Sequence, residues 1–209
     1  MLEELQPKAV IHTAGPFDDD TEAEVLQTVL EAEVPVYVDV ADPIPYIRQA
    51  KALAALAQEK GAMAVVTAGA FPGLSNVLAV ECARRLGDAR IKDVDFAYFT
   101  AGLGGSGAVN LLITNLGFGN PLPRVRNGRY TPEMAAGTGL RPVDFFISDK
   151  DPAKAVVGRQ DVWLWPFPEA ATVAEHLGIS GSSSASMGTA PGIWNTILVA
   201  LVQLVPRQW

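Results

Sequence analysis

Apolar residues follow two alternating spacings in the first part of the chain. Short β-branched runs are separated by stretches with helical spacing, a pattern typical of β-α-β units around a parallel sheet. The runs predict buried strands at residues 8–13, 36–40 and 62–67. The stretches between and after them predict three helices: one that ends before Pro35, one over residues 44–60, and one that ends at Gly87.

Particular residue types mark the ends of these predicted helices. Thr21 and Glu24 have the spacing of a capping box, which predicts that Thr21 caps the first helix. Gly61 suits the left-handed position after a helix, and Ser75 or Asn76 is expected to cap the third helix. The buried faces predicted for the first two helices consist of Val25, Leu26, Val29 and Leu30, and of Ile47, Leu53, Ala54 and Ala57.

The pattern changes after residue 90. Val94, Phe96 and Tyr98 alternate with their neighbours as in a strand of a more open sheet, so we place a domain boundary near residue 88. Further strands are predicted at 143–147, 155–157 and 162–165, a hairpin turn at Asn127-Gly128, and helices at 106–116, 169–177 and 191–205. The chain is therefore expected to hold two domains, residues 1–88 of α/β type and residues 89–209 of α+β type.

Two segments near the C-terminus differ in polarity. Residues 178–191, GISGSSSASMGTAP, are small and polar, which predicts a flexible loop. The apolar stretch Ile193–Val205 is shorter than the roughly 20 residues of a membrane-spanning helix. It lacks the Lys/Arg face of interfacial helices, so we interpret it as a core helix, with contact to a membrane surface as the alternative.

Composition and charge restrict the class of protein. Hydrophobic residues make up 49% of the chain and charged residues 19%, which indicates a folded domain. The formal net charge of −7 repels phosphate backbones, so nucleic acid is not an expected partner. The single cysteine, Cys82, cannot form an internal disulfide and is expected to fill a core. No metal site is expected from two histidines, and the absence of a basic and apolar leader predicts a cytoplasmic protein.

A glycine-rich segment follows the strand predicted around residues 94–99. Gly102, Gly104 and Gly107 satisfy the pattern G-x-G-x-x-G of dinucleotide-binding turns. The acidic residue that such a turn requires about 20 residues later is absent, because Leu122–Tyr130 carries only basic charges. Two interpretations of the glycine-rich segment stay open. It is either a turn that needs glycine for its backbone conformation, or a nucleotide site in which Arg124, Arg126 and Arg129 bind a 2′-phosphate.

Three other segments carry a family resemblance through their order. They are AVIHTAGPF at 9–17, VYVDVAD at 36–42 and AGAFPGLSN at 68–76. In this order and spacing, the sequence resembles the saccharopine dehydrogenase-like oxidoreductases. The resemblance implies the C-terminal part of a Rossmann-like parallel sheet, which binds NADP or NAD, followed by an α+β substrate or dimerisation domain.

The resemblance also implies roles for particular residues. It places Ala14, Gly15, Pro16 and Phe17 beside the cofactor, and the segment Ala70, Phe71, Pro72 and Gly73 beside the substrate. Asp39, which ends its strand, is expected to face the same crevice and to contact the cofactor. The alternative for residues 14–17 is an ordinary turn between a strand and a helix. The catalytic acid or base stays unidentified, because His12, Asp39 and Asp42 each have a structural explanation as well.

The front of a Rossmann-like domain has no counterpart in this sequence. Such a domain opens with a unit of roughly 30 residues that carries the phosphate-binding glycines, but only seven residues precede the first predicted strand. We therefore expect weak cofactor binding, an unpaired sheet edge, and either poor solubility or dimerisation.

The expected activity is hydride transfer between a nicotinamide cofactor and an imine or carbonyl carbon of a small molecule. The activity of this chain alone is expected to be low. The main alternative is a non-catalytic module that binds a protein or a membrane through the sheet edge and the helix at 193–205. A self-contained nucleotide binder built on Gly102–Gly107 is a third possibility.

Overall fold

A computed structural model describes residues 2–15, 17, 22–87, 91–101, 120–145 and 157–204. The chain divides into two compact units, Met1–Arg85 and Leu86–Trp209. The division lies close to residue 88, where the apolar pattern changes.

The first unit contains a parallel sheet of three strands, β1 (Val10–His12), β2 (Val36–Asp39) and β3 (Met63–Val65), in the order β1-β2-β3. Val10 lies opposite Tyr37, which lies opposite Ala64. All three strands point the same way, so the predicted parallel sheet is confirmed.

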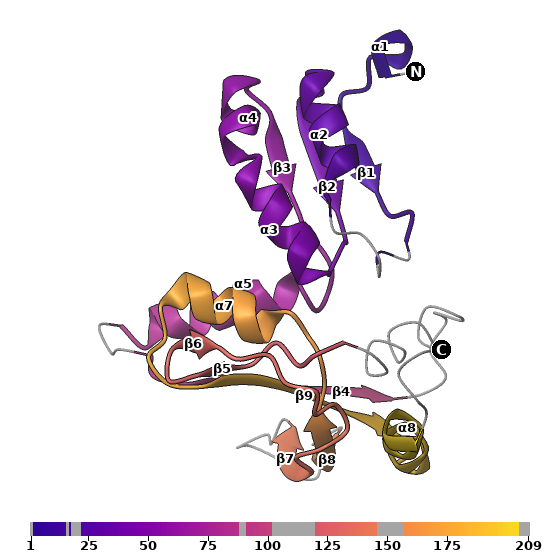
Figure 1. Cartoon of the computed structure of the whole chain (residues 1–209), viewed down its shortest axis with the longest axis vertical. Helices are drawn as coiled ribbons and strands as arrows, with labels where there is room; N and C mark the ends of the chain where they lie inside the picture. Colours follow the sequence, from indigo (N-terminus) through magenta and orange to yellow (C-terminus); the bar gives the residue numbers. More distant parts are fainter. Residues whose placement is uncertain are drawn as a thin grey trace. The chain divides into compact units, whose positions relative to one another are not determined.

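Helices pack against one face of this sheet (Figure 1). They are α2 (Glu24–Glu31), α3 (Ile44–Ala52) and α4 (Ala54–Glu59); the unit also contains α1 (Leu2–Leu5) and α5 (Leu74–Arg85). Leu26, Val29 and Leu30 of α2 are buried together with Tyr37 and Tyr46. This cluster forms the core of the unit.

Three predictions about these helices need correction. The capping box at Thr21 is wrong, because α2 begins at Glu24 after Ala23, where the acidic side chain complements the helix dipole. Val25 is 42% exposed, since the buried stripe of α2 is narrower than predicted. The single helix expected over residues 44–60 is broken at Leu53, which ends α3 and precedes α4.

The prediction of a left-handed glycine after this helical segment is confirmed, since Gly61 follows Lys60, the C-cap of α4, with a φ of 63°.

The other face of the parallel sheet is apolar and accessible. Ile11 is 71% exposed, Met63 60% and Val65 44%. Parallel sheets are normally covered on both faces. Among the described residues, β1 and β3 each pair only with β2, so both edges of the sheet are open as well.

The second unit is built on a mixed sheet. Its strands are β4 (Val94–Ala101), β5 (Val125–Arg126), β6 (Arg129–Tyr130), β7 (Arg141–Phe145), β8 (Gly158–Leu164) and β9 (Ser183–Ala190). The order is β6-β5-β9-β8-β7, and β4 pairs with β9 in parallel while the other pairs are antiparallel. Helix α7 (Glu169–Leu177) packs on β4, β5 and β9, and α8 (Ile193–Leu204) packs on β9.

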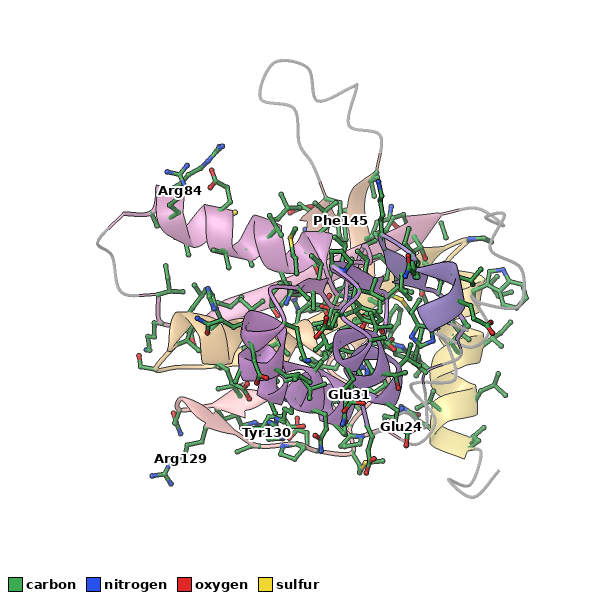
Figure 2. All side chains as sticks on the ribbon, turned by 90° about the horizontal axis from the view of Figure 1, so that it is seen from above. Glu24, Glu31, Arg84, Arg129, Tyr130 and Phe145 are labelled. Carbon is green, nitrogen blue, oxygen red and sulfur yellow. The ribbon has the colours of Figure 1, made fainter. Side chains whose placement is uncertain are left out.

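The predicted hairpin turn is confirmed. Asn127 and Gly128 join β5 to β6 with φ values of 50° and 68°, which suit the type I′ turn of two-residue hairpins. Figure 2 shows Arg129 pointing away from this hairpin.

The flexible loop predicted for residues 178–191 is wrong, because most of it forms β9 in the middle of the sheet. Small residues are required there for close packing. A Cβ atom on Gly188 would lie 2.3 Å from the backbone oxygen of Asp161. Helix α7, which packs on β9, also buries small residues, namely Ala170, Ala171 and Ala174.

Two further predictions of burial are wrong. Cys82 is exposed on α5 instead of filling a core. The helix at 193–205 is not a core helix, since its buried residue is the polar Asn195 while several apolar side chains are exposed. Asn195 lies inward because its amide pairs with both the N–H and the C=O of Thr189.

Several predicted features lie outside the described residues: Gly102–Gly107, the helix at 106–116, and residues 146–147 and 155–156 of two predicted strands. Residue 157 forms a bend and not a strand. Among the helices that the structure describes, none is long and apolar enough to span a membrane.

The packing of β9 predicts a position-specific effect of glycine substitution. Gly188→Ala should lower the free energy of unfolding by about 1–3 kcal/mol, because the added methyl group overlaps a backbone oxygen. Gly192→Ala is the matched control, since nothing lies within 4 Å of its Cβ position. Urea unfolding followed by tryptophan fluorescence measures both, because all four tryptophans of the chain belong to the second unit. Equal stabilities would contradict the assigned packing.

Candidate functional site

The motifs that carry the family resemblance meet where the carboxyl ends of the three strands of the first sheet lie side by side. We use 'this edge' for these strand ends and not for the open sides of β1 and β3. Because β1, β2 and β3 are parallel, the residues that follow each strand lie at the same edge, where open α/β sheets bind ligands. Thr13, Ala14 and Gly15 are exposed there. Pro16 lies outside the described residues.

Asp39, which is buried, connects the end of β2 to the segment after β3 by hydrogen bonds. Its Oδ1 accepts the N–H of Ala41 at 3.1 Å and the N–H of Thr67 at 2.8 Å, and its Oδ2 accepts the hydroxyl of Tyr46. Its backbone oxygen accepts the N–H of Ala68. The side chain is 0% exposed, so Asp39 holds this edge in shape, and the contact with a cofactor expected from the sequence is not available to it.

Two buried tyrosines extend from Asp39 to His12. The hydroxyls of Tyr46 and Tyr37 are 3.1 Å apart, and the hydroxyl of Tyr37 is 3.2 Å from Nδ1 of His12. Burial, followed by the hydrogen bond to Asp39, raises the pKa of Tyr46 well above its usual value of about 10. The result is a continuous chain of polar groups from a buried carboxylate to a half-buried imidazole.

Phe17 is part of the core. Only 8% of it is exposed, and its ring meets that of His12 edge-on with 5.2 Å between centroids. A Cβ atom on Gly15 would lie 3.2 Å from the Phe17 ring, so the glycine allows this turn to pack closely. Phe17 therefore supports His12 from one side.

The segment after β3 is a tightly closed turn. Gly73 has a φ of 128°, and a Cβ atom there would lie 2.2 Å from the backbone oxygen of Gly69. The N–H of Leu74, the first residue of α5, donates to that same oxygen. The predicted cap at Ser75 or Asn76 is wrong, because α5 begins at Leu74 and both residues lie inside its first turn, where the side-chain oxygen of Asn76 accepts the N–H of Gly73.

The four residues expected to contact substrate therefore differ in position. Ala70 is exposed, Phe71 and Gly73 are half-buried, and Pro72 is buried. Of these, Ala70 is the residue most open to a ligand.

Tyr37 and Tyr46 were missed as functional residues in the sequence. A usable signal exists for one of them, because Tyr37 and Asp39 are two residues apart in a strand and so share a face. Tyr46 comes from a helix, and no spacing rule connects it to Asp39.

A second buried acid lies in the other unit and was also missed. Glu169, the first residue of α7, is 0% exposed and accepts the hydroxyl of Tyr98 on β4 at 2.7 Å. The ring of Phe167 packs edge-on against Tyr98. The hydrogen bond between Tyr98 and Glu169 links α7 to strand β4 of the sheet.

A comparison with protein-family models found no match to this chain, and a comparison with curated proteins found none of significant similarity.

The Tyr46 contact predicts a specific response to alkali. In the unfolded chain Tyr46 loses its proton above about pH 10, whereas the folded state keeps it, so its contribution to stability is complete below that pH and lost above it. Tyr46→Phe should cost about 1.5–3 kcal/mol at pH 8. Above about pH 10 the difference between the two proteins should shrink by about 1.4 kcal/mol per pH unit.

Urea titrations at pH 8 and 11, followed by the methyl NMR signals of residues 1–85, measure this difference. Tyr130→Phe is the control, since Tyr130 is 37% exposed and lies in the other unit. A difference that stays constant with pH would contradict the placement of Tyr46.

Proposed function

We propose that this edge binds the nicotinamide end of NAD or NADP, and that the chain is a NAD(P)-dependent oxidoreductase of the saccharopine dehydrogenase-like type. The carrying observation is the convergence of the three resembling segments at the ends of three adjacent parallel strands. Hydride would pass between the nicotinamide and an imine or carbonyl carbon of a small substrate. The first sheet would then be the C-terminal part of a Rossmann-like sheet.

The residues present fit an uncharged or cationic ligand better than a phosphate. Helix α2, which follows β1, begins with Glu24 in its first turn and has no side-chain cap. The sequence just before it adds Asp18, Asp19, Asp20 and Glu22. An anion is unfavourable next to the carboxylate of Glu24, even at a helix N-terminus. The nicotinamide half of the cofactor meets this requirement, and the pyrophosphate half does not.

The role of this chain's own residues is to shape and order the edge. Asp39 fixes the backbone of Ala41 and Thr67, and the exposed residues 13–15 follow β1 directly after His12, which lies opposite Asp39. Such preorganised backbone orients a ring without further loss of conformational entropy on binding. The cofactor, when bound, supplies the hydride chemistry.

The proposal predicts selective binding of one half of the cofactor. Nicotinamide riboside, a phosphate-free cation, should shift the amide NMR signals of residues 12–15 and 67–71 at millimolar concentration, whereas adenosine 2′,5′-bisphosphate should not. Ala14→Trp should abolish these shifts by filling the edge, and Ala54→Trp, at another exposed alanine in α4, should not. Isothermal titration with NADPH should give no micromolar affinity for this chain. Shifts by the bisphosphate alone would refute the proposal.

A second candidate function, self-association, is favoured by α8. One face of this helix packs on β9, and another face exposes Trp194 (46%), Ile197 (39%), Leu201 (42%) and Leu204 (81%). Their 3-4-3 spacing is the apolar seam by which helices pair. We infer that this seam pairs with the same seam of a second copy.

Charge supports this choice of partner. Residues 1–85 hold 13 of the 23 acidic and 6 of the 16 basic residues, so the first unit carries the entire formal charge of −7. Residues 86–209 hold 10 of each, and α8 has no charged residue. Two copies of the second unit therefore approach each other without net repulsion. A standard interface uses roughly 20–30 residues a side, whereas the seam has four exposed apolar side chains, so the dimer is expected to be weak.

Leu201→Lys should abolish concentration-dependent dimerisation in analytical ultracentrifugation, because it places two like charges in the seam. Val25→Lys is a matched control, since Val25 is also 42% exposed but lies on α2. Ile11→Lys tests the open face of the parallel sheet as the competing interface. Loss of the dimer with Ile11→Lys and not with Leu201→Lys would reject the assignment.

A further inference from the structure

The polar chain from Asp39 to His12 has a fixed direction of proton donation. It contains three contacts: His12 to Tyr37, Tyr37 to Tyr46, and Tyr46 to Asp39. Each contact needs one proton between its two atoms. The Tyr46 hydroxyl donates to Oδ2 of Asp39, while Oδ1 accepts two backbone N–H groups, so the proton of this contact comes from Tyr46.

The same reasoning assigns the remaining two protons. Tyr46 has already used its proton, so Tyr37 donates to the oxygen of Tyr46. Tyr37 has then used its own, so the contact with His12 carries a proton only if Nδ1 of His12 donates. The neutral imidazole is thereby held with its proton on Nδ1. Its other nitrogen, Nε2, is left as an acceptor.

We propose that His12 is the proton acceptor of this edge, held in the Nδ1–H tautomer by Tyr37, Tyr46 and Asp39. His12 is half-buried at the end of β1, directly before the exposed residues 13–15. Phe17 packs against its ring and limits its rotation. Phe17 and Tyr37 thus orient the imidazole of His12. Asp39 determines that Nε2 is the acceptor nitrogen, through the hydroxyls of Tyr46 and Tyr37.

The catalytic part of this proposal rests on the proposed function. When bound, the nicotinamide would supply the hydride acceptor for the oxidation of an amine or alcohol to an imine or carbonyl. His12 would take the proton of the substrate nitrogen or oxygen on Nε2 as the C–N or C–O bond becomes double. The imidazolium that forms would still donate from Nδ1 to the hydroxyl of Tyr37. In the reverse direction His12 returns the proton.

The tautomer is measurable without cofactor or substrate. The chain has two histidines, so selective ¹⁵N labelling gives two imidazoles, and His176→Gln identifies the signal of His12. With the ring neutral, long-range ¹⁵N–¹H spectra should show the proton of His12 on Nδ1. Tyr46→Phe should move it to Nε2, because Tyr37 loses its acceptor and then donates to Nδ1. A residue that only supports the fold would not change a tautomer at this distance.

Tyr98→Phe is the matched control, since Tyr98 also donates to a buried acid but in the other unit. It should leave the His12 tautomer unchanged. Wild-type His12 with its proton on Nε2 would overturn the proposal even if Tyr46→Phe failed to fold. Tyr37→Phe, which removes the direct partner, should also abolish the preference for Nδ1–H.

The cofactor half is tested separately on the same labelled protein. Nicotinamide riboside should shift the Nε2 signal of His12 in the wild-type chain. An Nδ1–H tautomer with no response to nicotinamide riboside would reject the proposed function and the role of His12 in it, while the proton order of the chain would stand. A response without the Nδ1–H tautomer would keep the function and reject the relay.

Discussion

The buried carboxylate of Asp39 is the interaction on which the candidate site depends. A charged group without exposure to water is tolerated only when donors surround it, and here two backbone N–H groups and the Tyr46 hydroxyl do so. Those donors come from the turn after β2, from the end of β3 and from α3. One side chain therefore fixes the distances among three elements of the first unit. The same demand for donors orders the protons of Tyr46, Tyr37 and His12.

The second unit depends on close approach instead of charge. Its central strand β9 consists of small residues, and Gly188 allows the backbone at Asp161 to come nearer than any side chain would permit. Alanines on α7 continue this close packing on the covering layer. Net charge is unequal between the units as well. The net acidic charge lies in the first, which also exposes the apolar sheet face at Ile11, Met63 and Val65, whereas the second unit has no net charge and exposes the seam of α8.

Local patterns predicted those elements whose form depends on near neighbours in sequence. The alternation of strands and helices, the turn at Asn127-Gly128, the glycine after α4 and the extent of α7 follow from periodicity and backbone preference. The prediction for residues 178–191 failed because small polar residues suit both a loop and a strand enclosed by neighbours. Cys82 and α8 failed for a related reason, since an apolar residue does not by itself indicate which surface will cover it.

The sequence by itself determined that strands alternate with helices over residues 8–67, which predicts a parallel sheet, and it placed Asp39 and His12 near the ends of strands, because periodicity and turn residues are local properties. Only the tertiary structure decided what those residues do. Tyr46 on α3 contacts Asp39, and Tyr37 on β2 contacts His12 on the adjacent strand β1. No spacing rule in the sequence predicts either contact. Burial then converted Asp39 from an expected ligand contact into the support of the edge, because solvent exclusion depends on everything packed around a residue.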